Sequence, residues 1–154
     1  MGIKKQNNKG FTIIEVVLVL AIAGLIFLMV FIALPALQSS QRDTARKNDA
    51  AIVLSAINSY VSNNRGTLPT TAAQIDTYVT NRSSSTLAGA AGFNVAAAYV
   101  ATVTPVDGVI NIIPRAICGT GSGAVQNLTA GSNSNYSVVV RLEAGSGTPF
   151  CQNN

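Results

Sequence analysis

The chain contains no histidine, and only 10% of its 154 residues are charged. Histidine is the side chain that most often transfers protons in enzymes, and it is a frequent metal ligand. The six acidic residues are scattered, and neither of the two cysteines has a candidate base beside it. The sequence therefore offers no catalytic constellation and no metal-ligand cluster, and we expect a non-enzymatic protein without a cofactor.

Two further signals are missing. The glycine-rich run at 119–123 lacks the lysine of a phosphate-binding loop and the strand and helix that flank one, so we expect a flexible loop there. The net charge of +4 depends on three lysines in the first ten residues. The rest of the chain has seven basic and six acidic side chains, a net charge of +1, and so carries no basic footprint for nucleic acid.

What the sequence does have is a nearly unbroken apolar run from Phe11 to Leu37. As a helix, this run would be roughly 40 Å long, which exceeds the roughly 30 Å of hydrocarbon in a bilayer. Lys4, Lys5 and Lys9 precede it, and this arrangement predicts a cytoplasmic N-terminus with everything after about residue 38 outside.

Three interpretations fit an N-terminal apolar run. A cleaved secretory signal normally has an apolar core of about 7–15 residues and a small-residue cleavage site after it, and this run is nearly twice too long. An uncleaved signal anchor explains the lysines and the length, but it leaves unexplained a glycine next to Phe11 and an acid four residues further on. The third interpretation depends on that acid, Glu15, which is the one charge within the run. Because a charge at the centre of a membrane helix costs roughly 2.5–3.5 kcal/mol, we expect Glu15 to have a partner.

The residues Lys-Gly-Phe-Thr-Ile-Ile-Glu at 9–15, behind a short basic leader, resemble the cleavage and methylation site of type IV prepilins. The resemblance implies that residues 1–10 are a leader removed after Gly10, and that the new amine of Phe11 is methylated. It also implies that residues 11–37 cross the membrane and later form a filament core. In the filament, Glu15 would pair with the Phe11 amine of a neighbouring subunit, and two unit charges about 4 Å apart gain about 4 kcal/mol at an effective dielectric of 20.

Gly24 and Pro35 are the two helix-disfavouring residues within the apolar run. Glycine costs about 1 kcal/mol relative to alanine in a helix, and proline removes one hydrogen bond and clashes with the preceding turn. We expect curvature or local melting near them. The resemblance implies partial unwinding between Gly24 and Pro35 in a filament, and an ordinary proline kink is the alternative.

From Gln38 the sequence becomes amphipathic and predicts that the helix continues to about Asn63, with a stop at Asn64–Gly66. One face is apolar and should be buried, and Ile52, Ala56 and Tyr60 flank it, either widening the core or meeting a neighbouring subunit. The apolar face consists of Ala50, Val53, Leu54, Ile57 and Val61. The first turns of this part carry four charges, and we expect them to form a solvated face, with a subunit interface as the alternative. These charges are Asp43, Arg46, Lys47 and Asp49.

The remaining sequence predicts an extracellular α+β head at 38–154. A short second helix begins after a cap at Thr70 or Thr71 and ends near Asn81, and a surface loop follows at 83–92. Strands are predicted at 95–103, 109–113 and 136–142, with a turn at Asp107-Gly108. We expect them to form an antiparallel sheet of three or four strands that packs on the long helix.

Cys118 and Cys151 are the only cysteines, and in an extracellular head they have one possible pairing. We expect a disulfide that closes a loop of some 34 residues. A closing pair near the C-terminus also resembles the disulfide loop of many type IV pilins.

Together these features predict a type IV pilus subunit in the membrane as a precursor and outside the cell in a homopolymeric filament. Its implied partners are a prepilin peptidase that also methylates, the pilus assembly platform and the cytoplasmic membrane. Adhesion, twitching motility and DNA uptake are the roles such filaments serve. The alternatives are a pseudopilin of a type II secretion or competence machine, and a membrane-anchored binding domain that never polymerises. Acidic calcium-binding loops would favour a secretion pseudopilin, and Asp76, Asp107 and Glu143 are well separated in the sequence.

Overall fold

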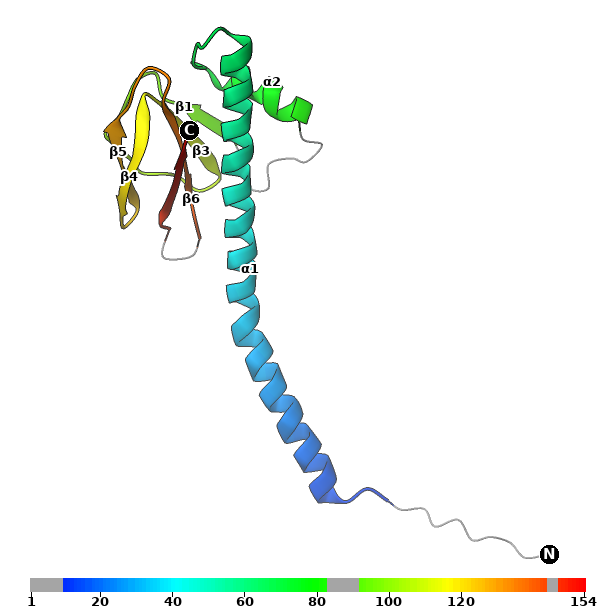
Figure 1. Ribbon diagram of the computed structural model, residues 1–154. Coiled ribbons are helices and arrows are strands. Elements are labelled where there is room, and N and C mark those ends of the chain that lie inside the picture. The colour runs from blue at the N-terminus through cyan, green and yellow to red at the C-terminus, as the bar shows by residue number, and fades with distance from the viewer. Residues whose placement is uncertain (1–9, 83–91, 144–146) are drawn as a thin grey trace, which may run out of the picture. The chain divides into compact units, whose positions relative to one another are not determined.

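The computed structural model describes residues 10–82, 92–143 and 147–154 (Figure 1). The chain divides into two units, Met1–Gln38 and Ser39–Asn154, and one helix, α1 (Ile13–Asn63), contributes to both. The second unit adds a short helix and strands to its part of α1, so the predicted α+β class is confirmed.

In the first unit α1 continues without interruption through Gly24 and Pro35. Of the two effects expected near these residues, curvature or local melting, local melting is therefore absent from this structure. Pro35 removes only the hydrogen bond to the carbonyl of Phe31, and the neighbouring backbone bonds are enough to continue the helix. The large apolar side chains of this segment are exposed in the chain alone, including Phe11, Leu25 and Phe31.

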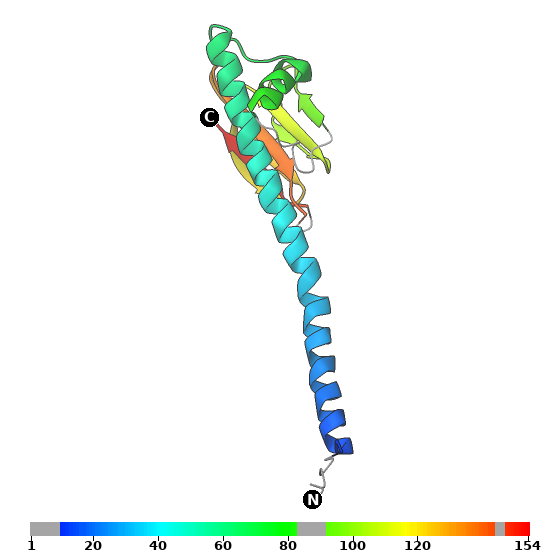
Figure 2. The same ribbon diagram turned by 90° about the vertical axis from the view of Figure 1, so that its right-hand side faces the viewer.

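In the second unit, called the head here, the rest of α1 lies against a β-sheet (Figure 2). Ala50, Val53 and Ile57 are fully buried, as the helical spacing predicts. Ala56 is also fully buried and Tyr60 nearly so, which shows that the flanking stripe widens the core of the head. The predicted stop is present, because the amide of Gly66 donates to the carbonyl of Val61 at 2.9 Å and closes the C-terminal turn.

The described part of the head contains two sheets and one further helix. The four-stranded sheet has the order β1-β3-β6-β7, and the three-stranded sheet has the order β2-β5-β4. The elements are α2 (Ala72–Arg82), β1 (Gly92–Val95), β2 (Thr102–Val103), β3 (Val109–Pro114), β4 (Ala116–Ser122), β5 (Val125–Ala130), β6 (Tyr136–Arg141) and β7 (Pro149–Asn153). Strand pairing is antiparallel except that β1 runs parallel to β3.

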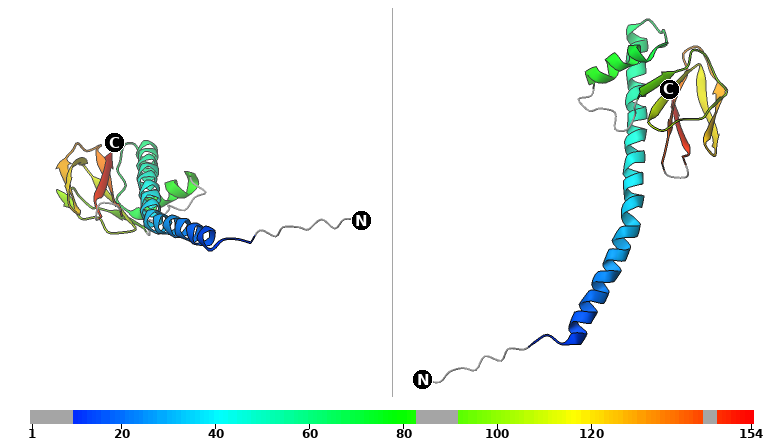
Figure 3. Two further views of the ribbon diagram at one scale, coloured as in Figure 1. Left: turned by 90° about the horizontal axis from the view of Figure 1, so that it is seen from below. Right: turned by 180° about the vertical axis from the view of Figure 1, so that it is seen from behind.

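The second helix begins as the sequence predicts, one residue after Thr71. The side-chain oxygen of Gln74 accepts hydrogen bonds from the amides of Thr70 and Thr71, at 2.8 and 3.1 Å. This is the returning half of a capping box, in which the third residue of the helix binds the backbone before it. Figure 3 shows α2 next to the last turns of α1, where the rings of Tyr60 and Tyr78 meet edge to face.

Three expectations about the strands were wrong. The predicted strand at 95–103 is two short strands, β1 and β2, in different sheets, because the chain leaves the first sheet after Val95. The run at 119–123 is the end of β4 and a tight turn into β5, where Gly123 has a φ of 59°. Gly119 sits so close to Asn127 that a Cβ would lie 2.9 Å from its carbonyl oxygen. The glycines in this run therefore permit close strand pairing and a turn.

The third error was the number of strands, because β4, β5 and β7 were not predicted. Glycines interrupt the apolar alternation in β4, and glutamine and asparagine interrupt it in β5 and β7, so period-two patterning is weak. The turn at Asp107-Gly108 and strands β3 and β6 are present at the predicted places, and the predicted loop at 83–92 lies outside the described residues except for Gly92, which begins β1.

Candidate functional site

The helix begins with a reciprocal cap between Thr12 and Glu15. The Thr12 amide and hydroxyl both donate to Glu15 Oε2, at 3.0 and 2.8 Å. In return the Glu15 amide donates to the Thr12 carbonyl at 3.1 Å, and its distance to the Thr12 hydroxyl is 3.4 Å. Thr-Ile-Ile-Glu is thus a capping box, a pattern that the sequence contains and that we did not predict. Within the single chain, the Glu15 carboxylate binds its own helix start.

Phe11 and Gly10 precede this cap and are both exposed, and the Phe11 side chain is 89% exposed. A Cβ built on Gly10 would meet no atom within 4 Å, and Gly10 does not have a positive φ. Neither packing nor backbone conformation in the described chain requires glycine at this position. A need for glycine at residue 10 would have to come from a molecule that binds the segment from outside.

Most of the exposed large apolar side chains of the described residues lie in the segment that follows the cap. α1 is long and apolar enough to cross a bilayer, and none of its most apolar segment is buried within the chain. An isolated run of this kind in water would be unstable, because single soluble proteins rarely expose contiguous apolar patches above a few hundred Å². The segment therefore needs a covering environment, and lipid or further helices of the same kind would provide one.

Of the four charges expected on a solvated face near the start of the head, only Lys47 is exposed, and Asp43 and Asp49 are buried. Arg46 is only 11% exposed, and it donates to the carbonyl of Arg141, to Glu143 and to Asp107, at 2.8, 2.8 and 2.7 Å. Asp43 is buried and accepts the amide of Glu143 at 2.6 Å. Asp107 lies about 60 residues further along the chain than Arg46, and Arg141 and Glu143 lie about a hundred residues further along than Arg46 and Asp43, so helical spacing alone could not reveal these partners.

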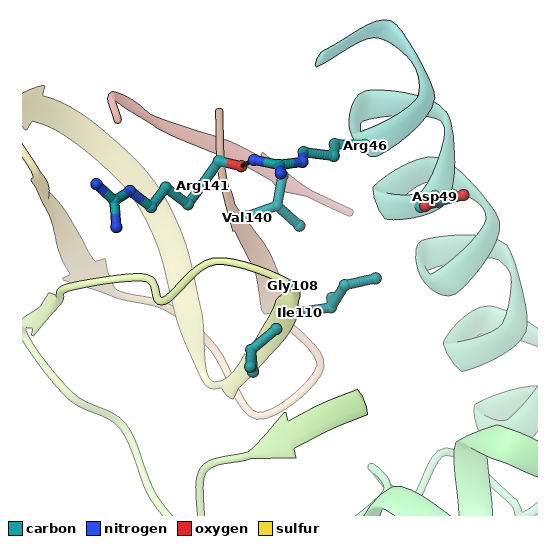
Figure 4. A pocket seen from close by; sticks show the side chains of 7 residues that line it. Arg46, Asp49, Gly108, Ile110, Val140 and Arg141 are labelled. Atoms are coloured by element: carbon teal, nitrogen blue, oxygen red, sulfur yellow. Dashed lines mark hydrogen bonds between the residues drawn. The ribbon is translucent and has the colours of Figure 1, made fainter. Parts of the chain in front are cut away.

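The same contacts bring together Asp107 and Glu143, which are well separated in the sequence. Both carboxylates bind the same nitrogen of Arg46, and Glu143 also binds Arg42 at 2.8 Å. Arg46 lines a cavity of about 10 Å³, together with Asp49 and residues of β3 and β6 (Figure 4). We call Arg42, Asp43, Arg46, Asp107 and Glu143 the arginine clamp, because it ties the head part of α1 to two loops of the sheet.

Cys118 and Cys151 are joined by a disulfide, with an S–S distance of 1.98 Å. Cys118 lies in β4 and Cys151 in β7, so the bond connects the three-stranded sheet to the edge of the four-stranded sheet. The described residues contain no cluster of three or more acidic, cysteine or histidine side chains that could hold a metal ion.

Residues 5–31 match the family model for the prokaryotic N-terminal methylation motif, which is the type IV prepilin-like signal. The match covers the predicted cleavage site, the cap and most of the apolar run. Neither the curated proteins nor the solved structures contain a significant match to this chain. The motif and the apolar helix fit a type IV pilin-like or pseudopilin protein. The motif is of the structural pilin type, and it implies processing by a prepilin peptidase.

Proposed function

We propose that this chain is a structural subunit of a type IV pilus filament. The match of residues 5–31 to the methylation motif supports this proposal, since the matched segment is also the exposed apolar surface that needs a covering environment. Residues 1–10 are a leader removed after Gly10, residues 11–37 cross the cytoplasmic membrane and then form the filament core, and residues 38–154 form the extracellular head.

In this proposal the same apolar side chains serve two successive environments. Before assembly they contact lipid, and after assembly they contact the equivalent helices of neighbouring subunits. Cleavage gives Phe11 a free amine, which is methylated and pairs with Glu15 of a neighbour. That amine replaces the Thr12 groups that bind Glu15 in the single chain, so assembly exchanges hydrogen bonds within one helix for an ion pair between two. Gly24 and Pro35 would allow the helix to unwind locally in the filament.

The deciding experiment is mass spectrometry of surface material sheared from cells that express the chain. If the chain is a filament subunit, the sheared material should sediment as polymers, and each subunit should begin with N-methylated Phe11. A pseudopilin would be cleaved and methylated in the same way, but it would remain with the cell envelope instead of appearing in sheared filaments. A non-polymerising anchored domain would stay monomeric in the membrane, and an N-terminus at Met1 would exclude the processing step.

A further inference from the structure

The head contains a pocket of about 390 Å³ that the assembly function does not use. It lies where the loop after α1, the segment after β1 and the β3–β4 corner come together. Its lining consists of Gly66, Thr67, Leu68, Pro69, Thr70, Ala96, Ala97, Ala98, Pro114, Arg115 and Asn133. This volume falls within the range of small-molecule sites, about 300–1,000 Å³.

Arg115 carries the only charge among the described residues that line the pocket. It is the single residue between β3 and β4, and its φ is 57°, in the left-handed region where glycine is usual. The Arg115 amide donates to the carbonyl of Asn135 at 2.7 Å, and the Arg115 carbonyl accepts the amide of Gly131 at 2.8 Å. The backbone at this corner is thus fixed on both sides, while the side chain is exposed.

Glycine at residue 115 would adopt this left-handed backbone conformation with less strain than arginine does. An arginine there supplies a cation at the pocket, and an outlier of this kind supports a functional hypothesis. The guanidinium has a planar set of donors that matches a carboxylate, and Asn133 adds an amide to the same lining. Prolines, alanines and Leu68 make the walls mostly apolar. A single cation and apolar walls suit a singly charged ligand with an apolar body.

We propose that this pocket binds a small organic carboxylate with an apolar body, held by Arg115. Binding at this pocket would involve residues of the head alone and would not depend on assembly into a filament. N-acetyl-L-leucine is a suitable probe, because it has one carboxylate and a branched apolar side chain. N-acetyl-L-leucinamide is its uncharged counterpart of nearly the same shape.

Each probe is titrated into the isotope-labelled full chain in detergent micelles, and amide chemical shifts are recorded. We expect saturable shifts at 66–68, 96–98 and 115 with the acid, and about tenfold weaker binding of the amide. Arg115→Gln should weaken binding of the acid to the level of the amide. Arg65→Gln is the matched control, because Arg65 is also exposed and left-handed, with a φ of 55°, but it does not line the pocket.

Equal affinity for acid and amide would overturn the proposal, and this comparison needs no variant to fold. It would also be overturned if no saturable shift occurs up to roughly 10 mM, a concentration at which weak fragments bind. An equal loss of binding in Arg65→Gln and Arg115→Gln would show that general surface charge attracts the acid, and would overturn the proposed site as well.

Discussion

The Thr12 hydroxyl donates a 2.8 Å hydrogen bond to the Glu15 carboxylate, which also accepts the Thr12 amide. Glu15 thus has two competing uses, as a helix cap in the single chain and, in the proposed filament, as the partner of the Phe11 amine of a neighbour. Two substitutions separate these uses, because glutamine can also complete a capping box, whereas removal of the Thr12 side chain leaves the charge of Glu15 unchanged.

Glu15→Gln should insert into the membrane and be cleaved normally, but should form few or no surface filaments. The change leaves the neighbour's amine unpaired in an apolar core, and removing one partner of a buried ion pair costs about 3–5 kcal/mol. The measurement is the number of filaments on cells that lack the native copy. Thr12→Ala is the control: it costs about 1 kcal/mol of helix capping and should still allow assembly. Wild-type filament numbers from Glu15→Gln would show that the pair is dispensable.

Gly10→Val should trap the full-length precursor in the membrane without disturbing the fold. A Cβ at residue 10 meets no atom of the described chain within 4 Å, so the defect would come from a peptidase that accepts only a small residue before the cleaved bond. Gly24→Ala is the matched control, since a Cβ at Gly24 also meets nothing within 4 Å. Immunoblotting should show uncleaved Gly10→Val and cleaved Gly24→Ala, and normal cleavage of Gly10→Val would argue against a prepilin site.

Arg46→Leu should destabilise the head by about 2–4 kcal/mol, because it leaves partly buried Glu143 and the Arg141 carbonyl without the guanidinium that binds them. Arg42→Leu is the comparison, since Arg42 binds the same Glu143 but is 59% exposed and should contribute at most about 1 kcal/mol. Chemical denaturation of both variants, followed by near-UV circular dichroism, measures the difference. Equal losses would mean that the clamp contributes no more than a surface ion pair.

Replacing Cys118 and Cys151 together with serine should lower the free energy of unfolding by about 3–4 kcal/mol, the entropy of closing a loop with a sequence separation of 33. The loss should appear first as fraying of β7, which is an edge strand of its sheet. Hydrogen exchange at 149–153 monitors this fraying. Free thiols in the folded, unreduced protein would contradict the bridge.

The sequence was most informative where a pattern is local. The unbroken apolar run and the period of the apolar face on α1 predicted the helix to Asn63, and the Asp107-Gly108 turn followed from its own two residues. The arginine clamp could not be predicted, because the partners of Arg46 lie about 60 to 100 residues away in the sequence. β4 was missed for a related reason. Gly119 in β4 permits the close approach of Asn127 in β5, and this requirement comes from strand pairing, which the residues around Gly119 do not reveal.

The head should lose stability as the pH rises from about 10 to 12, because the Tyr136 hydroxyl is buried. Burial raises the pKa of Tyr136 from 10.0 to about 12, and its hydroxyl donates to Asn58 at 2.7 Å. The unfolded chain therefore loses this proton at a lower pH than the folded chain does. The contribution is complete below pH 10, and it is lost as the pH rises through the raised pKa.

Denaturation of the wild-type head at intervals from pH 9 to 12 measures this loss, and Tyr136→Phe should remove the part of the slope that Tyr136 causes. The variant should also lose about 1 kcal/mol at neutral pH, where the hydrogen bond to Asn58 is intact in the wild type. Tyr78→Phe, which changes another hydrogen-bonded tyrosine of the head, should keep the Tyr136 slope. An unchanged alkaline slope in Tyr136→Phe would show that burial of this hydroxyl does not determine the alkaline limit of the fold.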